Sequence, residues 1–316
     1  MVDRQTPMLL FLLFWSSAED RYRERYISAF LGGLVVCAIL AYYNWAQLHW
    51  FPDWPRGIRV LKNESDTAPF VDRIMYTPIL ALGAYFSLRR AVESAGSHSR
   101  VLAVLITGLF LSNLSFSGGR AGMVMFAVLF ATLIFERVKV RIKALLLCAV
   151  FFPVVFLAAY STQDYFAQRV DEAVMDIRTF EQNPNTSFGL RVVYPATSFQ
   201  LFMQNPVLGV GSGDFTEEYA KVKRVYWPST PDTFNPHNQF LFTAATTGIL
   251  GLAALLSIFY FAAFSGSDLR LRPMLIGFAV ICVLESYLWR SNTALTFSAI
   301  LAVLVSRIGG KTGAKS

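Results

Sequence analysis

The chain has 316 residues, of which 54% are hydrophobic and only 16% are charged, and its formal net charge at pH 7 is +7. This balance excludes an ordinary soluble domain and predicts a protein that crosses a membrane several times. An excess of Lys and Arg suits a nucleic-acid partner when it forms one basic face, but here these residues are scattered through short loops. We therefore expect no nucleic-acid partner, and membrane topology explains the basic residues better.

Apolar runs of spanning or near-spanning length recur along the chain. They lie at about 7–16, 27–48, 74–89, 101–117, 121–136, 144–161, 238–264, 274–290 and 293–308. A helix needs about 20 residues to cross the hydrocarbon core, so we expect an all-α polytopic membrane protein with about nine transmembrane helices. The first run is too short to cross alone, which leaves the end of a longer helix or a surface segment. It has no basic region or cleavage site of a signal peptide.

The polar segment 162–237 separates two strongly apolar blocks. We therefore expect three parts: an N-terminal transmembrane block over 1–161, a large helical loop outside the membrane over 162–237, and C-terminal transmembrane helices with a cytoplasmic tail over 238–316. Apolar spacing predicts short helices over 164–181 and 189–204, and another over 214–225. The glycine-rich run 205–213 predicts a turn that allows close approach of the backbone to a neighbour.

The orientation follows from the basic residues of alternate loops, which face the cytoplasm by the positive-inside rule. The N-terminus is then outside, the C-terminus is inside, and the large loop 162–237 faces outward. The loop 49–73 conflicts mildly with this orientation, because it also carries Arg56, Arg59, Lys62 and Arg73. The basic residues expected in the cytoplasm are Arg21, Arg23, Arg25, Arg89, Arg90, Arg100, Arg137, Lys139, Arg141, Lys143, Arg270, Arg272, Arg307, Lys311 and Lys315.

Three polar residues stand out as candidates for chemistry. Arg120 lies among glycines at an outward turn between two spans, where an arginine faces either a wet cavity with an anion or the lipid headgroups. Arg191 lies on a predicted loop helix, where an arginine is more often simply solvated. His237 lies where the loop re-enters the membrane, which suits a general base and equally a capping or interfacial histidine.

Metal and disulfide chemistry have little support in the sequence. The histidines lie on different loops, and neither an HxxxH pair nor a carboxylate cluster accompanies them. Cys37, Cys148 and Cys282 all lie inside apolar runs, where a thiol behaves as a small hydrophobic group. We expect no metal site and no disulfide framework.

Four short motifs occur in order along the chain. They are Ser117-Gly118-Gly119-Arg120-Ala121-Gly122, then Gly189-Leu190-Arg191, then residues 205–215 with the sequence NPVLGVGSGDF, and then residues 236–241 with the sequence PHNQFL. Over roughly 100–260 the chain therefore resembles the O-antigen ligase and polymerase superfamily of bacterial inner membranes. Residues 67–74 resemble the ligase branch.

The resemblance implies a multi-pass inner-membrane glycosyltransferase with its active site facing the periplasm. It implies transfer of O-antigen from undecaprenyl pyrophosphate to the lipid A-core of lipopolysaccharide, with inversion and without a metal or other cofactor. Arg120 and Arg191 would hold the pyrophosphate, and His237 would activate the acceptor. An O-antigen polymerase and a protein O-oligosaccharyltransferase remain alternatives within the superfamily. The alternative class is a transporter or flippase, although the spans show no repeated halves.

Four further residues are candidates to line the same cavity, namely Gly119, Asn238, Glu285 and Arg290. Glu285 and Arg290 are charged residues within the predicted membrane run 274–290, so they either face this cavity or pair with each other. Members of the family carry about twelve spans with the large loop after the ninth, whereas here the loop follows the sixth predicted run. The resemblance thus implies that three helices are missing from the front.

Overall fold

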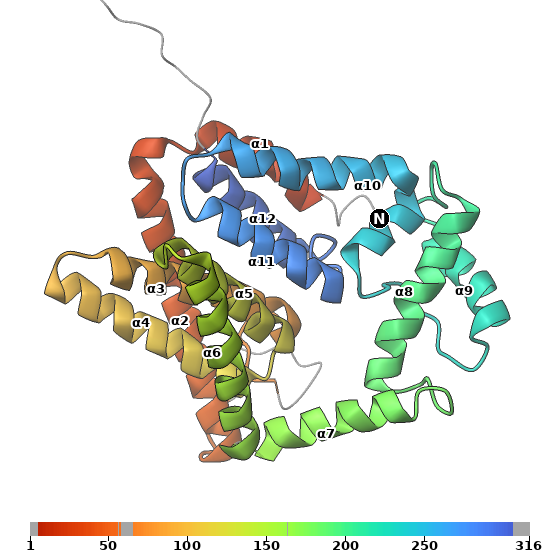
Figure 1. Ribbon diagram of the computed structural model, residues 1–316, viewed down its shortest axis with the longest axis horizontal. Coiled ribbons are helices and arrows are strands. Elements are labelled where there is room, and N and C mark those ends of the chain that lie inside the picture. The colour runs from red at the N-terminus through yellow and green to blue at the C-terminus, as the bar shows by residue number, and fades with distance from the viewer. Residues whose placement is uncertain (1–5, 56, 58–65, 163, 306–316) are drawn as a thin grey trace, which may run out of the picture. The chain divides into compact units, whose positions relative to one another are not determined.

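The computed structural model describes residues 6–55, 57, 66–162 and 164–305, and its described residues form helices and loops without a strand (Figure 1). This confirms the all-α prediction. The predicted tail, the end of the last apolar run and the basic residues Arg56, Arg59 and Lys62 lie outside the described residues. The chain divides into two compact units. Unit 1 holds residues 134–260 and 282–286, and unit 2 holds the remaining described residues.

Four helical segments of the described chain are long and apolar enough to cross a membrane. They are Asp20–His49, Ser97–Ser117, Arg141–Ala158 and Gln239–Ser265, and two shorter apolar helices follow at Leu271–Leu284 and Ser291–Leu304. The apolar runs between them also form helices, of which Arg73–Glu93 is largely buried. These segments support a multi-pass membrane protein.

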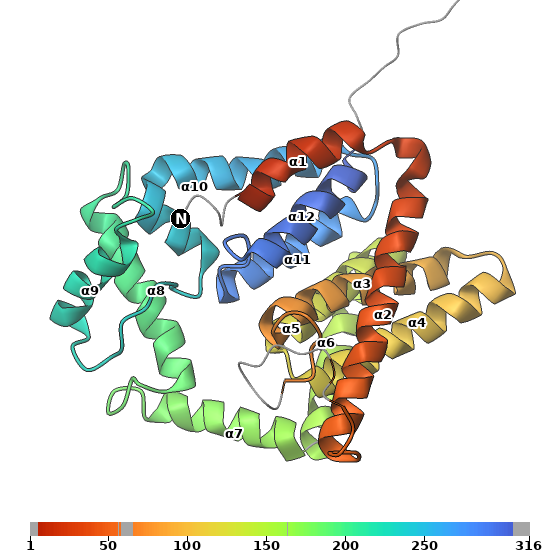
Figure 2. The same cartoon turned by 180° about the vertical axis from the view of Figure 1, so that it is seen from behind.

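Unit 2 contains most of the N-terminal block and the last two helices. Its elements are α1 (Thr6–Ser17), the 3-10 turn η2 (Asp20–Tyr22), α2 (Arg23–His49), α3 (Arg73–Glu93), α4 (Ser97–Ser117), α5 (Arg120–Arg137), α11 (Leu271–Leu284) and α12 (Ser291–Leu304), although the ends of α5 and α11 belong to unit 1. The first, short run forms α1, which packs along α12. In Figure 2, α2, α3 and α4 lie against one another.

A buried asparagine joins these three helices. Asn113 of α4 is fully buried, and its side-chain amide donates to the carbonyl of Ala38 at 3.0 Å. Its oxygen accepts from Tyr76 of α3 at 3.4 Å and from Ser117 at 3.1 Å. A buried amide is tolerated only when its polar atoms have partners, so Asn113 favours one register of α2, α3 and α4.

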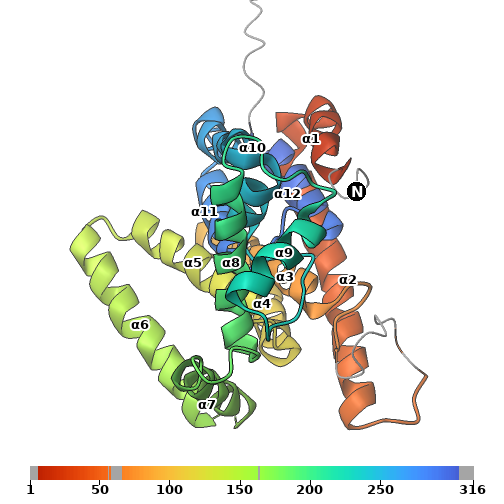
Figure 3. The same ribbon diagram turned by 90° about the vertical axis from the view of Figure 1, so that its right-hand side faces the viewer.

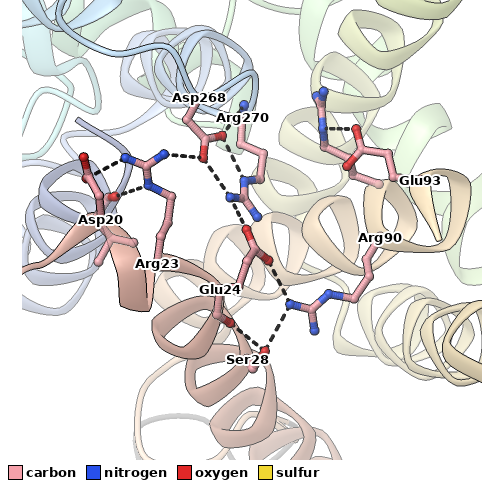
Figure 4. Close-up of polar contacts among 10 residues, drawn as sticks. Asp20, Arg23, Glu24, Ser28, Arg90, Glu93, Asp268 and Arg270 are labelled. Carbon is pink, nitrogen blue, oxygen red and sulfur yellow. Dashed lines mark hydrogen bonds and ion pairs between the residues drawn. The ribbon is translucent and has the colours of Figure 1, made fainter. Parts of the chain in front are cut away.

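Ion pairs tie together three of the loops that the positive-inside rule places on one side (Figure 4). Arg270, before α11, binds Asp268 at 2.7 Å and Glu24 of α2 at 2.5 Å. Glu24 also binds Arg90 of α3 at 3.2 Å, and Arg23 reaches Asp268 at 3.5 Å. Loops expected on the same membrane face thus meet in unit 2. The cluster lines a cavity of about 320 Å³ with as many acidic as basic side chains, namely Glu24, Glu93 and Asp268 beside Arg89, Arg90 and Arg270.

Unit 1 holds the expected loop helices between two long apolar ones. It consists of α6 (Arg141–Thr162), α7 (Asp164–Arg178), α8 (Ser187–Gln204), α9 (Phe215–Tyr226) and most of α10 (Gln239–Ser265), with the short segment 282–286. Figure 3 shows α7 turning away from the end of α6, and α8 beside α9. The predicted helices over 164–181, 189–204 and 214–225 are therefore confirmed to within a few residues.

Two predicted runs differ from the helices observed. The run 274–290 is not one helix, because α11 ends at Leu284 and α12 begins at Ser291 after a turn. The chain leaves the helix at Glu285, whose side chain bonds to the polar loop before α10. The run 238–264 forms α10, but Gly248 breaks it with a φ of 67° and a ψ of −164°.

Candidate active site

His237 lies in the last turn before α10 and is held in an uncommon backbone conformation. Its φ is 54°, in the left-handed region, and its N–H donates to the side-chain oxygen of Asn235 at 3.0 Å. Pro236 restricts the backbone of Asn235 to extended conformations. Asn238 follows as the cap of α10, since its side-chain oxygen accepts from the N–H of Leu241 at 3.0 Å. The local sequence therefore fixes His237 at the helix entrance.

Glu285 is the partner of the His237 imidazole. Its Oε2 lies 2.7 Å from Nδ1 of His237, and its Oε1 accepts from the amide of Asn235 at 2.5 Å and from the N–H of Ser286 at 2.9 Å. Glu285 is buried, whereas a third of the His237 side chain is exposed. An ionised carboxylate only accepts hydrogen bonds, so opposite an ionised Glu285 it is Nδ1 that donates, and in the neutral imidazole of this tautomer Nε2 carries the free lone pair. This arrangement provides an oriented base.

Asn235 completes the arrangement. It is buried, and its side-chain oxygen accepts from the hydroxyl of Ser286 at 2.7 Å in addition to the N–H of His237. Asn238 adds a bond from its amide to the carbonyl of Val283 at 3.2 Å. The short segment 282–286 is therefore hydrogen-bonded to the loop that carries the histidine.

Tyr194 connects His237 with α8. The two rings stack with centroids 5.7 Å apart and planes inclined by 21°. Burial, together with the nearby charge of Asp232, raises the pKa of Tyr194, so its phenol stays neutral. Arg191 precedes Tyr194 by three residues, so the two side chains lie about one helical turn apart on α8. Arg191 is exposed, and its guanidinium donates to the carbonyl and hydroxyl of Ser187, each at 2.9 Å.

The first turn of α8, which carries Arg191, is anchored from several directions. Thr186 caps it by accepting from the N–H of Gly189 at 3.0 Å. Asp176 of α7 accepts from the N–H of Phe188 at 3.1 Å. Gly189 lies so close to the preceding loop that a Cβ there would be 2.4 Å from the carbonyl oxygen of Pro184.

A buried lysine holds the loop that leads to His237. Lys223 of α9 donates to the carbonyl of Thr230 at 2.7 Å and pairs with Asp232 at 2.8 Å. Because Lys223 is buried, it would carry an uncompensated charge without Asp232. The loop after α9 therefore has a defined path toward Asn235.

Arg120 and Gly119 lie in unit 2, where Arg120 is the exposed first residue of α5. Gly118 ends α4 in the left-handed conformation, with a φ of 65°. A Cβ at Gly119 would be 2.0 Å from Oγ1 of Thr77, and one at Gly122 would be 2.6 Å from the Thr77 backbone. The glycines thus allow the turn to contact α3, as their small size predicts.

The structure gathers some of the predicted site residues. His237, Asn238 and Glu285 meet in unit 1, and Arg191 lies one helical turn from the tyrosine stacked on His237. Arg120, Gly119 and Arg290 belong to unit 2, where Arg290 precedes α12. The sequence predicted Glu285 as a candidate to line the cavity of His237, but it did not predict their direct contact.

Sequence reasoning missed three members of this arrangement. The contacts of Asn235 with Ser286 and of Tyr194 with His237 join residues far apart in the chain, so no local pattern indicates them. Glu285, by contrast, could be predicted from the sequence, because an acidic residue at the end of an apolar run needs a polar partner.

Comparison with known families places this site in context. Residues 102–256 match a family model described as O-antigen ligase, and this segment contains Arg120, Arg191 and His237. No curated protein matches the chain. The match agrees with the resemblance seen in the four motifs. The match over residues 102–256 supports the O-antigen ligase superfamily, whose members are glycosyltransferase-like enzymes, and it does not separate the ligase branch from the polymerase branch.

Proposed function

We propose that this protein is an O-antigen ligase of the bacterial inner membrane, with its active site facing the periplasm. It transfers a glycan from undecaprenyl pyrophosphate to a sugar hydroxyl of the lipid A-core. The observation that carries this proposal is the imidazole of His237, oriented by Glu285 and Asn235 in a chain of the O-antigen ligase superfamily. A histidine oriented by a carboxylate is a suitable general base.

His237 begins the reaction as the base. Its Nε2 takes the proton of the acceptor hydroxyl while that oxygen attacks the anomeric carbon of the donor sugar. The bond from the anomeric carbon to the pyrophosphate oxygen breaks, and the leaving pyrophosphate keeps the electron pair. Attack from the opposite face gives inversion. Glu285 stabilises the imidazolium that forms, because its carboxylate stays bonded to Nδ1.

Arginines supply the positive charge that the leaving group requires. Negative charge builds on the pyrophosphate as the bond breaks, and a guanidinium binds phosphate oxygens in a bidentate manner. Arg191 suits this role because it is exposed on the helix whose Tyr194 stacks on the base. Arg120 is the second proposed ligand of the pyrophosphate, on the basis of its glycine-rich motif. With two guanidinium groups, the transfer needs no metal ion.

A transfer assay with purified protein, lipid-linked glycan and rough lipopolysaccharide tests this proposal. It is run with EDTA and compares the parent chain with His237→Ala, Arg191→Ala and Arg120→Ala. We expect chelation to leave the parent rate unchanged. Loss of the base should lower the rate about 10²–10⁴-fold, and loss of either arginine about 10²-fold or more.

Arg224→Ala is the matched control, because it removes an exposed arginine of α9 in the same unit. It should keep the parent rate. Product formed equally by His237→Ala and the parent would refute the role of the base. Product with a second lipid-linked glycan or a Ser/Thr peptide, and none with lipopolysaccharide, would assign the protein to the polymerase or protein-glycosylating class instead.

A further inference from the structure

The glycine-rich run before α9 pairs with the break in α10. The break at Gly248 releases backbone groups that a continuous helix would bond, and the carbonyls of Ala245 and Thr246 instead accept from the N–H groups of Val210 and Gly211, each at 2.9 Å. The N–H of Ile249 donates to the carbonyl of Pro206 at 2.8 Å. We call residues 205–211 and the break the clasp.

Only glycine fits at the two closest points of the clasp. Gly209 and Gly248 both have a φ of 67°, which side chains disfavour. A Cβ at Gly209 would lie 2.4 Å from the backbone of Thr246, and one at Gly248 would lie 2.1 Å from the carbonyl oxygen of Val207. The glycine-rich run therefore does approach another backbone closely, and that backbone is α10 itself.

The solvent exposure of the apolar side chains of α10 changes at the clasp. Before the break, Phe242, Ala244 and Ala245 are buried in unit 1. Directly after it, Ile249 is 48% exposed and Leu250 is 59% exposed. The neighbouring clasp residues Val207 and Leu208 are 58% and 71% exposed, and neither 205–213 nor 239–265 contains a charged residue.

We propose that Val207, Leu208, Ile249 and Leu250 form one apolar patch that is immersed in the hydrocarbon of the bilayer. The patch is continuous with α10, which is long and apolar enough to span the membrane. The clasp hydrogen bonds give partners to the carbonyls of Ala245 and Thr246 and to the N–H of Ile249, and irregular backbone at membrane depth requires such partners. This places part of 162–237 within the membrane, whereas the sequence predicted the whole segment outside it.

The immersed patch has a consequence for His237. The half of α10 before the break is packed in unit 1 and begins directly after His237 and Asn238. Ten residues of helix span about 15 Å. The clasp therefore keeps His237 within about 15 Å of the patch, measured along α10. This distance does not depend on which glycan the protein transfers.

The depth of the patch can be measured by fluorescence quenching. An environment-sensitive dye is attached to Leu208→Cys in the full chain, with Cys37, Cys148 and Cys282 replaced by Ala, and the protein is placed in phosphatidylcholine nanodiscs. We expect nitroxides on the acyl chains to quench the dye and iodide in the water to leave it unquenched. Val225→Cys is the matched control, because Val225 is 75% exposed and lies among the charged residues of α9. A dye on Val225→Cys should be quenched by iodide and not by the nitroxides.

Quenching of both sites by iodide alone would overturn the proposal. A second comparison needs no cysteine replacement, namely Leu208→Glu against Val225→Glu in the parent chain. A carboxylate in hydrocarbon is costly, so only Leu208→Glu should lower the yield of folded protein in the membrane and its unfolding midpoint in nanodiscs. Equal behaviour of the two variants would also overturn it.

Discussion

At His237, backbone strain and side-chain contacts act together. A left-handed backbone costs free energy for a residue other than glycine, and the bond from His237 N–H to Asn235 offsets part of that cost. The stacked ring of Tyr194 and the carboxylate of Glu285 then fix the imidazole itself. A base held in this way loses little freedom when the acceptor arrives, which favours the near-attack geometry that transfer requires.

The role of Glu285 predicts a specific kinetic defect. Glu285→Gln keeps the size of the side chain but removes the charge that stabilises the imidazolium. We expect kcat to fall about 10²–10⁴-fold, with little change in the KM for the lipid-linked donor. Glu285→Asp should recover part of the rate because it restores the charge. Steady-state kinetics of the purified variants checks this.

Glu217→Gln is the control for this prediction, since Glu217 is an exposed residue of α9 that pairs with Lys221. It should behave as the parent. If Glu285→Gln raised the KM and left kcat unchanged, Glu285 would act in binding and would not orient the base.

At the scale of elements, the clasp makes α10 and the preceding loop one structural piece. Gly248→Ala forces a Cβ against the backbone of Val207 and a side chain into a positive φ. We expect a loss of stability of about 1–3 kcal/mol, seen as a lower midpoint of thermal unfolding in detergent. Gly213→Ala is the matched control, because nothing lies within 4 Å of its Cβ position, and it should change stability by less than about 0.5 kcal/mol. Equal midpoints for the two variants would contradict the clasp.

The ion pairs of unit 2 predict a pH dependence of stability. Burial by itself would raise the pKa of Asp268, but the side chain and backbone N–H of Arg270, with the charge of Arg23, outweigh it and hold the pKa below its ordinary value. A carboxyl with a lowered folded pKa stabilises the protein above about pH 4, the ordinary value of Asp, and this contribution is lost as the pH falls through the folded pKa.

Asp268→Asn should therefore destabilise the protein by about 2 kcal/mol at neutral pH and weaken the decline in acid. Thermal unfolding at several pH values measures both effects. Glu19→Gln removes a carboxylate that pairs with Arg21 on the exposed surface, so it should cost at most about 0.5 kcal/mol. An acid decline as steep in Asp268→Asn as in the parent would assign the pH dependence to other groups.

At the scale of the whole molecule, α6 and α10 decide the topology of the large loop. Both are long and apolar enough to span a membrane, and they flank the loop helices α7, α8 and α9. If both cross, the segment before α6 and the segment after α10 share one side, and the helices between them share the other. The basic residues before α6 and before α11 assign the shared side to the cytoplasm.

Labelling from outside the membrane tests this topology. In a cysteine-free chain, Asn185→Cys should react with a membrane-impermeant maleimide in intact spheroplasts. Lys139→Cys should react only after permeabilisation, and both positions are exposed on the protein surface. Reaction of Lys139→Cys, and not of Asn185→Cys, in intact spheroplasts would show that the orientation is the opposite of the predicted one. Equal reaction of the two cysteines would show that α6 does not cross the membrane.

The sequence by itself determined the helical membrane class, the short helices of the large loop and the candidate residues, because hydropathy and apolar spacing depend on near neighbours in the chain. Tertiary structure alone decided that Glu285 pairs with His237, 48 residues away. It also decided that α10 breaks at Gly248 and that α11 ends at Leu284. These features depend on hydrogen bonds between distant segments, and local periodicity carries no information about which distant groups will satisfy a buried carboxylate or a released carbonyl.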